Sequence, residues 1–269
     1  MPEGHTLRRL ARDLETTFGG RRVRVASPQG RFAGSAGLLD STLLRGASSA
    51  GKHLFLEFSR GRWVHIHLGL YGTFQIGTAP APDPRGQIRL RLSTSRAYAD
   101  LRGPTACELV TGRERDGVLA RLGPDPLSPY AEPTHAWRRI ARSRTPIGVL
   151  LTRQDVVSGV GNAYRAELLF RHRVEPHRSG RELTREVWCA MWADLVALMH
   201  EGVRTGRIDT VRSEHTPEAM GRPPRTDRHG GEVYVYRRAG QGCLVCSTPV
   251  ATEVMAGRNL FWCPSCQTL

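Results

Sequence analysis

Four cysteines near the end of the chain have the spacing of a metal site. They form two Cys-x-x-Cys pairs separated by sixteen residues: Cys243 and Cys246, then Cys263 and Cys266. Each pair turns both thiolates toward one point, and a hairpin of this length can bring the second pair to the same ion. Zinc would supply folding energy that so short a segment cannot gain from burial. Because four thiolates leave no open coordination position, we expect one structural Zn²⁺ ion.

Two disulfides or a redox pair are the alternatives for these cysteines. The chain begins without the apolar stretch of a secretory signal, and no strand–helix–strand pattern surrounds either pair. Both observations favour zinc. The other two cysteines, Cys107 and Cys189, stand alone in the sequence. We expect both to be buried, small apolar side chains and not nucleophiles.

The chain begins Met1-Pro2-Glu3, which places an imino acid beside a carboxylic acid. An initiator methionine before a residue as small as proline is normally removed, so Pro2 is expected to carry a free secondary amine. One interpretation is a nucleophilic amine next to an acid. The other is structural, because proline is common at a helix start and glutamate in the first turn suits the helix dipole.

Lys52 is the only lysine among 39 Lys and Arg residues. A composition that keeps a single lysine suggests a task that a guanidinium cannot perform, such as proton transfer or a compact point charge. Nearby, His65 and His67 would share one face of a strand. Without a third ligand in view, we interpret them as structural histidines, with metal binding as the alternative.

Two glycine-containing turns could present groups to a ligand. In the first, Gly69 and Gly72 bracket Leu70 and Tyr71, which indicates either a turn that projects these side chains outward or a hairpin that packs them inward. The second turn, Gly-Val-Gly-Asn at 159–162, opens onto a helical pattern.

Backbone N–H groups at a helix start can hold a phosphate, so the turn at 159–162 is a candidate phosphate site. Arg153 and Arg165 flank it. A plain glycine bend between two helices is the alternative.

The periodicity of apolar residues indicates the elements that position these groups. Residues 7–14 have helical spacing, and Gly19 and Gly20 should end that helix. Short apolar runs separated by Gly, Pro and Ser follow, a pattern typical of an antiparallel sandwich or barrel. The runs are 22–26, 53–58, 63–68, 73–76, 87–92 and 106–111.

A proline-rich link at 123–129 marks a domain boundary. The helical period then returns in four segments, 135–141, 147–151, 163–171 and 183–204. Residues 204–231 are polar and are expected to be irregular. The cysteine hairpin follows, and its tip carries Arg258 and Asn259. We therefore expect three domains, at 1–125, 130–231 and 232–269.

The charge balance restricts the possible partners. The chain has 269 residues, with 39 Lys and Arg against 25 Asp and Glu, so its formal net charge is +14. Such a field favours nucleic acid first and an acidic membrane surface second, although high arginine content also accompanies GC-rich genomes. No apolar run approaches the ~20 residues of a membrane span. We expect a cytoplasmic monomer without a small-molecule cofactor.

Four motifs together resemble the formamidopyrimidine-DNA glycosylase / endonuclease VIII family of bacterial base-excision repair enzymes. They are Met-Pro-Glu-Gly at 1–4, Gly-Lys-His-Leu at 51–54, Val-Ser-Gly-Val-Gly-Asn-Ala-Tyr at 157–164, and Gly-Arg-Asn-Leu-Phe-Trp-Cys-Pro-Ser-Cys-Gln at 257–267. The resemblance spans the chain. It implies an α+β protein with an N-terminal β-sandwich and leading helix, a helix–two-turn–helix domain, and a zinc-ribbon hairpin.

The resemblance implies a role for each matching residue. Pro2 would be the nucleophile and Glu3 the acid, while Lys52 would assist catalysis and hold the DNA. Asn162 and Arg258 would grip the phosphates that flank the lesion. The enzyme would be a bifunctional glycosylase and lyase that acts on damaged double-stranded DNA through a Schiff base on Pro2, followed by β,δ-elimination.

Leu70 and Tyr71 fall where this family inserts side chains into the gap left by the flipped base. The Leu-Tyr pair and Gly4 are similar to the endonuclease VIII branch, so oxidised pyrimidines are expected ahead of 8-oxoguanine and ring-opened purines. Gly69 stands where the best-known wedge of that branch has glutamine, so recognition of the opposite base is expected to differ.

A non-catalytic DNA-binding protein with a zinc ribbon and a helix–two-turn–helix is the rival hypothesis. Such a protein would have no need of Pro2, Glu3 and Lys52 together. Because the chain carries all three, the enzyme is favoured.

Overall fold

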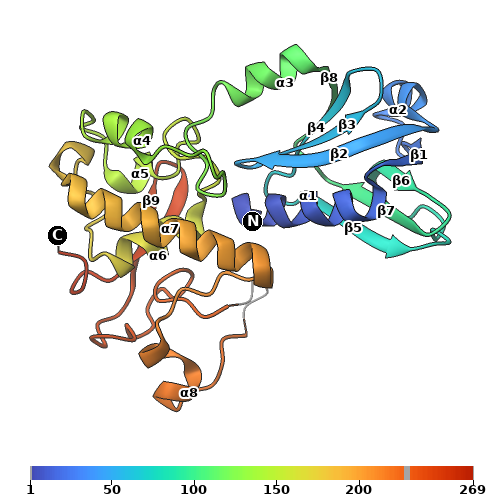
Figure 1. Cartoon of the computed structure of the whole chain (residues 1–269). Helices are drawn as coiled ribbons and strands as arrows, with labels where there is room; N and C mark the ends of the chain where they lie inside the picture. The colour runs from blue at the N-terminus through green and yellow to red at the C-terminus, as the bar shows by residue number, and fades with distance from the viewer. Residues whose placement is uncertain (1, 227–230, 269) are drawn as a thin grey trace. The chain divides into compact units, whose positions relative to one another are not determined.

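The computed structural model describes residues 2–226 and 231–268 of the chain. The chain divides into two compact units, here called unit 1 (Met1–Arg121) and unit 2 (Leu122–Leu269). Each unit has its own apolar core. The division of unit 2 into separate domains at 130–231 and 232–269 stays a prediction. Figure 1 labels the elements along the chain.

Unit 1 contains an antiparallel β-sandwich, as the family resemblance implied. Its eight strands form one continuous hydrogen-bonded order, β5-β7-β6-β1-β2-β3-β4-β8. β1 (Arg21–Ala26) joins the two layers, because its first half pairs with β2 and its second half with β6. The other strands are β2 (Thr42–Ala50), β3 (His53–Phe58), β4 (Arg62–His67), β5 (Thr73–Thr78), β6 (Ile88–Ser93), β7 (Ala97–Arg102) and β8 (Ala106–Thr111).

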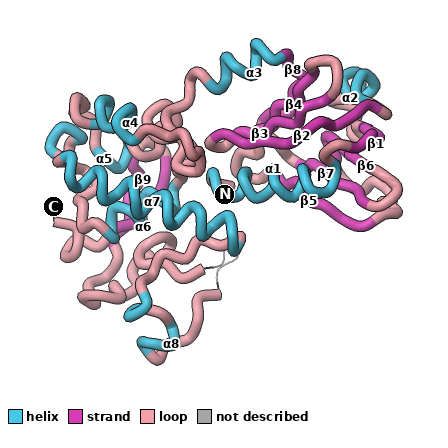
Figure 2. The backbone as a smooth tube through the Cα atoms, viewed as in Figure 1, coloured by secondary structure: helices cyan, strands magenta, loops and turns pink. Residues whose placement is uncertain are grey.

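The leading helix α1 (Gly4–Phe18) packs against β2. Its apolar stripe is buried, and Gly19 caps its end, as the spacing predicted. α1 runs antiparallel to β2, because the N–H of Gly20 donates to the carbonyl of Leu44 and the Glu15 carboxylate accepts from the N–H of Ala47. Figures 1 and 2 show this helix lying along the strand.

This pairing sets the position of the helix start. From Glu15 back to Glu3 the helix rises ~18 Å at 1.5 Å per residue. From Ala47 forward to Lys52 the chain advances ~16 Å at about 3.3 Å per residue. The N-terminal end of α1 and the β2–β3 turn that carries Lys52 therefore lie at the same end of unit 1.

Four elements of unit 1 were not predicted: β2, β7, α2 (Ala33–Leu39) and α3 (Gly112–Leu119). β2 has the sequence Thr-Leu-Leu-Arg-Gly-Ala-Ser-Ser-Ala, which has little intrinsic preference for a strand. It becomes a strand because β1 and β3 supply hydrogen-bonding partners along its two edges. Tertiary pairing overrides local propensity here.

Unit 2 contains the four helices that the period predicted, each within two residues of the expected bounds. They are α4 (Pro133–Ile140), α5 (Ile147–Leu150), α6 (Asn162–Arg171) and α7 (Arg185–Thr205). The stretch expected to be irregular holds one 3-10 turn, Ser213–His215, and the short α8 (Pro217–Met220). Its residues 227–230 lie outside the described part. A hairpin of β9 (Ala251–Met255) and β10 (Arg258–Trp262) follows.

These findings confirm the predicted α+β fold class, with a β-sandwich unit followed by a helical unit and a hairpin. Within the described residues, no helix is both long enough and apolar enough to cross a bilayer.

Candidate functional site

The four cysteines of the two Cys-x-x-Cys pairs converge on one point. Their sulfur atoms all lie within 4.8 Å of one another. Sγ of Cys243 is 3.9 Å from Sγ of Cys266, and Sγ of Cys246 is 3.5 Å from Sγ of Cys263. A tetrahedral ion with Zn–S bonds of ~2.3 Å needs S–S edges of about 3.8 Å, so the cluster fits one structural zinc ion. The predicted cofactor is confirmed.

Gln267 links this cluster by hydrogen bonds to the rest of unit 2. Its side-chain oxygen accepts from the N–H of Cys263 at 2.8 Å, and its amide nitrogen donates to the carbonyl of Val174 at 3.0 Å. The side chain is buried. Gln267 therefore ties the second cysteine pair to the segment that follows α6.

The hairpin β9–β10 presents Arg258 at its tip. Ala256 and Gly257 form the turn with positive φ angles of 49° and 73°. Arg258 and Asn259 come next, and both are exposed. The Arg258 side chain has no hydrogen bond or ion pair within the described residues, so its guanidinium can bind an anion.

A buried arginine links this hairpin to the start of α6. Arg165 is fully buried and donates to the Asn259 carbonyl at 2.8 Å and to the side-chain oxygen of Asn162. The Asn162 amide nitrogen also donates to the Asn259 carbonyl, at 2.6 Å. The expectation that Arg165 flanks a phosphate site is therefore wrong: its side chain points into the protein and positions Asn162 beside Arg258.

The glycine turn before α6 is held by Gln154. Its side-chain oxygen accepts from the N–H of Gly159 at 2.9 Å, and its amide nitrogen donates to the carbonyl of Val160 at 3.0 Å. Gly159 has a positive φ of 86°, and Gly161 caps the helix. These hydrogen bonds fix the conformation of the turn that precedes α6.

A second buried group, Glu167 on α6, holds the segment that leads to the zinc hairpin. Its carboxylate accepts three backbone N–H groups, those of Tyr234, Val235 and Tyr236, at 2.7–2.8 Å. It also accepts the Thr210 hydroxyl. The role of Glu167 was not predicted, because a charged residue in a helical pattern normally faces solvent.

In unit 1, Glu3 caps the N-terminal end of α1 and is buried, with 1% of its surface exposed. Its backbone N–H donates to the Thr6 hydroxyl at 3.4 Å. Pro2 is half-buried. Burial lowers the pKa of the neighbouring His5 to about 4, so this imidazole is neutral at pH 7.

Lys52 sits in the β2–β3 turn beside a cluster of three histidines, His53, His65 and His67. His53 Nδ1 and His65 Nε2 are 2.8 Å apart, and the His53 and His67 rings meet edge to face. Burial lowers the pKa of all three, that of His53 to about 4. The charge of Lys52 lowers the pKa of His67 further. The cluster is neutral at pH 7 and adds no charge next to the lysine.

The turn between Leu68 and Gly72 projects its two large side chains outward. Leu70 is 59% exposed and Tyr71 is 87% exposed, which matches the outward alternative. Gly69 has a φ of 68°, and a Cβ there would lie 1.9 Å from the Thr105 hydroxyl oxygen. A Cβ at Gly72 would lie 2.2 Å from the Leu68 carbonyl. Both glycines are therefore needed for this turn.

The two single cysteines differ from each other. Cys107 is buried as predicted, and burial raises its pKa to about 12. Cys189 is exposed on α7, so the expectation of burial was wrong there. It lies on the polar side of a helix whose apolar side packs through Trp188 and Trp192.

Three family profiles match the chain in order. They are the formamidopyrimidine-DNA glycosylase N-terminal domain over residues 1–107, the formamidopyrimidine-DNA glycosylase H2TH domain over 122–213, and a zinc finger found in FPG and IleRS over 240–269. With the sandwich and the four-cysteine ribbon, these matches define the class as DNA glycosylase. Within that class, the chain belongs to the formamidopyrimidine-DNA glycosylase family, which confirms the resemblance.

Relatives cover the full chain. Proteins named "Endonuclease 8 1" from Mycobacterium tuberculosis and Mycobacterium bovis are 52% identical over 275 residues, all of both chains. Formamidopyrimidine-DNA glycosylase from Thermus thermophilus is 32% identical over 99% of this chain and 97% of its own. The Lactococcus lactis Fpg bound to abasic-site DNA has the same fold, with a TM-score of 0.82 at 19% identity over 99% of this chain and 100% of that one.

Proposed function

We propose that this protein is a bifunctional DNA glycosylase and abasic-site lyase that removes oxidised bases, with pyrimidines favoured. The observation that carries the proposal is the shared position of three groups in unit 1. The helix start with Pro2 and Glu3 lies at the same end as the turn with Lys52, as the α1–β2 pairing requires. An amine, an acid and a second cation at one end are the parts that base excision needs.

In the proposed mechanism, Met1 is removed and the Pro2 nitrogen attacks C1′ of the damaged nucleotide. The N–C1′ bond forms as the bond from C1′ to the base breaks, and Glu3 protonates the sugar ring oxygen as the ring opens. A free α-amine has a pKa of ~8 against ~10.4 for lysine, so far more of it is neutral at pH 7. A prolyl amine has a somewhat higher pKa and still outcompetes Lys52.

The secondary amine can only form a cationic iminium, which withdraws electrons from the sugar. Loss of the C2′ proton then expels the 3′ phosphate, and a second elimination expels the 5′ phosphate. Hydrolysis returns the free proline. Zinc takes no part in these steps, because its four thiolates leave no open position.

The remaining residues would hold the substrate. Arg258 and Asn162 grip phosphates beside the lesion, and Lys52 contacts the backbone. Leu70 and Tyr71 fill the gap left by the extruded base. The partner is damaged double-stranded DNA, and the Leu-Tyr pair is the reason for favouring oxidised pyrimidines.

Borohydride trapping tests this mechanism, and the single lysine of the chain makes the adduct easy to assign. Only two amines can form a Schiff base, the terminal amine and the single Lys52. Untagged protein is mixed with an abasic-site duplex, or with a thymine glycol duplex, and reduced. Lys52→Gln should still be trapped on the abasic site, with the adduct mapped to Pro2.

The control is a protein whose N-terminus is blocked by a tag. We expect it to bind DNA without forming an adduct. If the blocked protein were trapped, Pro2 would be excluded as the nucleophile. The same would hold if Lys52→Gln were not trapped while the blocked protein was. Trapping on thymine glycol would support glycosylase action on oxidised pyrimidines, whereas trapping on the abasic site alone would leave only the lyase step.

A further inference from the structure

A hollow lined by four arginines lies at the opposite end of unit 1 from Pro2 and Lys52. It has a volume of about 590 Å³ and is lined by Arg21, Arg22, Arg24 and Arg96, together with the hydroxyl residues 93–95. β1 supplies three of the arginines, and the β6–β7 turn supplies the fourth. These segments meet because Arg24 pairs in register with Ser93.

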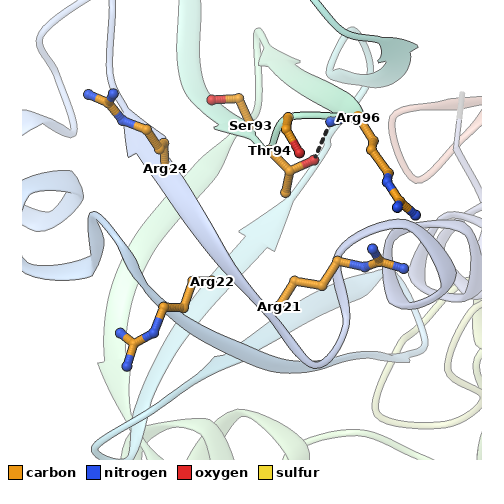
Figure 3. Close-up of a pocket in the computed structure, with 7 residues that line it drawn as sticks. Arg21, Arg22, Arg24, Ser93, Thr94 and Arg96 are labelled. Carbon is orange, nitrogen blue, oxygen red and sulfur yellow. Dashed lines mark hydrogen bonds between the residues drawn. The ribbon is translucent and has the colours of Figure 1, made fainter.

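The arginines of this hollow lack acidic partners. Within the described residues, Arg21, Arg24 and Arg96 have no side-chain hydrogen bond or ion pair, and Arg22 donates only to the Ser41 carbonyl. In Figure 3 the side chains of Arg21 and Arg96 reach toward each other, although like charges repel. Arg22 and Arg24 extend away from this pair in the figure, so the positive charges are spread along the hollow. Cations without counter-charges indicate a site for anions.

The lining also restricts what the anion can be. The hollow is lined only by arginine, serine and threonine, so it has no aromatic or aliphatic residue to receive a base or an apolar side chain. All four arginines are exposed, which suits a ligand that runs across the surface. Four positive charges match several phosphates better than one carboxylate.

We propose that this arginine hollow binds backbone phosphates of a DNA segment away from the lesion. The hollow lies next to the C-terminal end of α1. It is therefore about 22 Å, the length of that 15-residue helix, from the end of unit 1 that carries Pro2. Such a contact holds the protein on DNA without reading sequence. The site is separate from the catalytic end and does not depend on the chemistry proposed for Pro2.

Salt dependence of DNA binding tests the proposal with Arg21→Gln/Arg96→Gln. Neither side chain has a partner within the described residues, so the double variant should fold normally, as checked by its melting curve. On a duplex of about four helical turns, log K against log salt should become shallower by about 1.8, since each lost phosphate contact removes about 0.9.

A duplex of about one helical turn reaches only ~17 Å to either side of a central lesion and serves as the internal comparison. On it, the variant should bind and incise like the wild type. Arg31→Gln/Arg85→Gln, which removes two exposed arginines outside the hollow, is the matched control for net charge. Its slope on the long duplex should equal that of the wild type.

Free polyphosphate is a second source of the same chemistry, and inorganic tripolyphosphate is the probe for it. An unchanged slope on the long duplex would overturn the assignment to DNA. If tripolyphosphate then raised the melting temperature of the wild type and not of the double variant, the hollow would be a site for free polyphosphate. If neither probe distinguished the proteins, the hollow would not be a phosphate site.

Discussion

At the scale of single residues, Gly69 decides how Leu70 and Tyr71 are presented. Its positive φ favours glycine, and the Thr105 hydroxyl occupies the space of a Cβ. Any side chain at this position, a glutamine included, would overlap with Thr105. Unit 1 therefore depends on glycine at this position to expose the Leu-Tyr pair.

Gly69→Ala should destabilise unit 1 by at least ~2 kcal/mol, because about 1–2 kcal/mol of backbone strain adds to the overlap with Thr105. Gly61→Ala is the matched control, since Gly61 has a φ of 66° and open space around it. Urea unfolding monitored by hydrogen exchange in unit 1 measures both. If the two variants lost the same free energy of unfolding, the overlap with Thr105 would contribute nothing to the destabilisation.

Arg258→Ala should weaken DNA binding without changing stability. The side chain is exposed and has no partner within the described residues, so the free energy of unfolding should stay within ~0.5 kcal/mol. The slope of log K against log salt should become shallower by about 0.9. Arg138→Ala, which removes an exposed arginine of α4, is the comparison. Unchanged incision kinetics would remove Arg258 from the site.

At the scale of elements, buried charged groups hold unit 2 together where short segments meet. Arg165 connects the start of α6 to β10, and Glu167 connects the same helix to residues 234–236. Gln267 connects the zinc cluster to the segment after α6. α6 is thus the element to which the proposed phosphate-binding residues and the zinc hairpin are both attached.

Glu167→Gln should destabilise unit 2 by about 3 kcal/mol or more. The carboxylate accepts four hydrogen bonds, and hydrogen bonds to a charged group contribute about 1.5–3 kcal/mol each. A glutamine NH₂ would face N–H donors. Hydrogen exchange at residues 234–236 is the readout, and exposed Glu218→Gln on α8 is the control. Unaltered protection of these amides would contradict the assigned role.

Cys263→Ser should lose zinc and unfold the β9–β10 hairpin, because structural zinc supplies much of the folding energy of such a segment. Gln267→Ala should keep the four thiolates but bind zinc about tenfold or more weakly, because loss of a hydrogen bond that supports a metal ligand typically lowers metal affinity by that amount. Metal content after competition with a chelator measures both. Full retention of zinc by Cys263→Ser would refute the four-cysteine site.

At the scale of the whole molecule, histidines with shifted pKa values should contribute to the pH dependence of stability in opposite directions in the two units. In unit 1, burial holds the pKa of His5 and His53 at about 4, below the ordinary 6.5. The unfolded chain then binds more protons than the folded one between these values. In unit 2, burial would lower the pKa of His177, but hydrogen bonds with Glu175 and Glu253 outweigh it and raise the pKa.

Unit 1 should therefore be fully stable above pH ~6.5 and lose stability as the pH falls toward 4, by about 3 kcal/mol for buried His5. The contribution of His177 to unit 2 should be complete below pH ~6.5 and lost as the pH rises through its raised pKa. Hydrogen exchange resolved by unit measures this. His5→Gln and His177→Gln should each flatten the profile of their own unit.

Features whose geometry is local could be predicted from spacing along the chain. Two Cys-x-x-Cys pairs predicted the zinc site, and the 3.6-residue period predicted α4 to α7. The position of Pro2 next to Glu3 suggested a catalytic pair, which stays a prediction. Each of these depends on residues a few positions apart, so spacing alone carries the information.

Features that depend on what packs nearby could not be predicted in this way, because they arise from the tertiary structure. It made a strand of the Ser- and Gly-rich β2, turned Arg165 and Glu167 inward, and left Cys189 exposed. It also brought Arg21 and Arg96, some seventy-five residues apart in the chain, to one hollow. Burial and counter-charge are properties of the surroundings of a residue, and a linear pattern does not contain those surroundings.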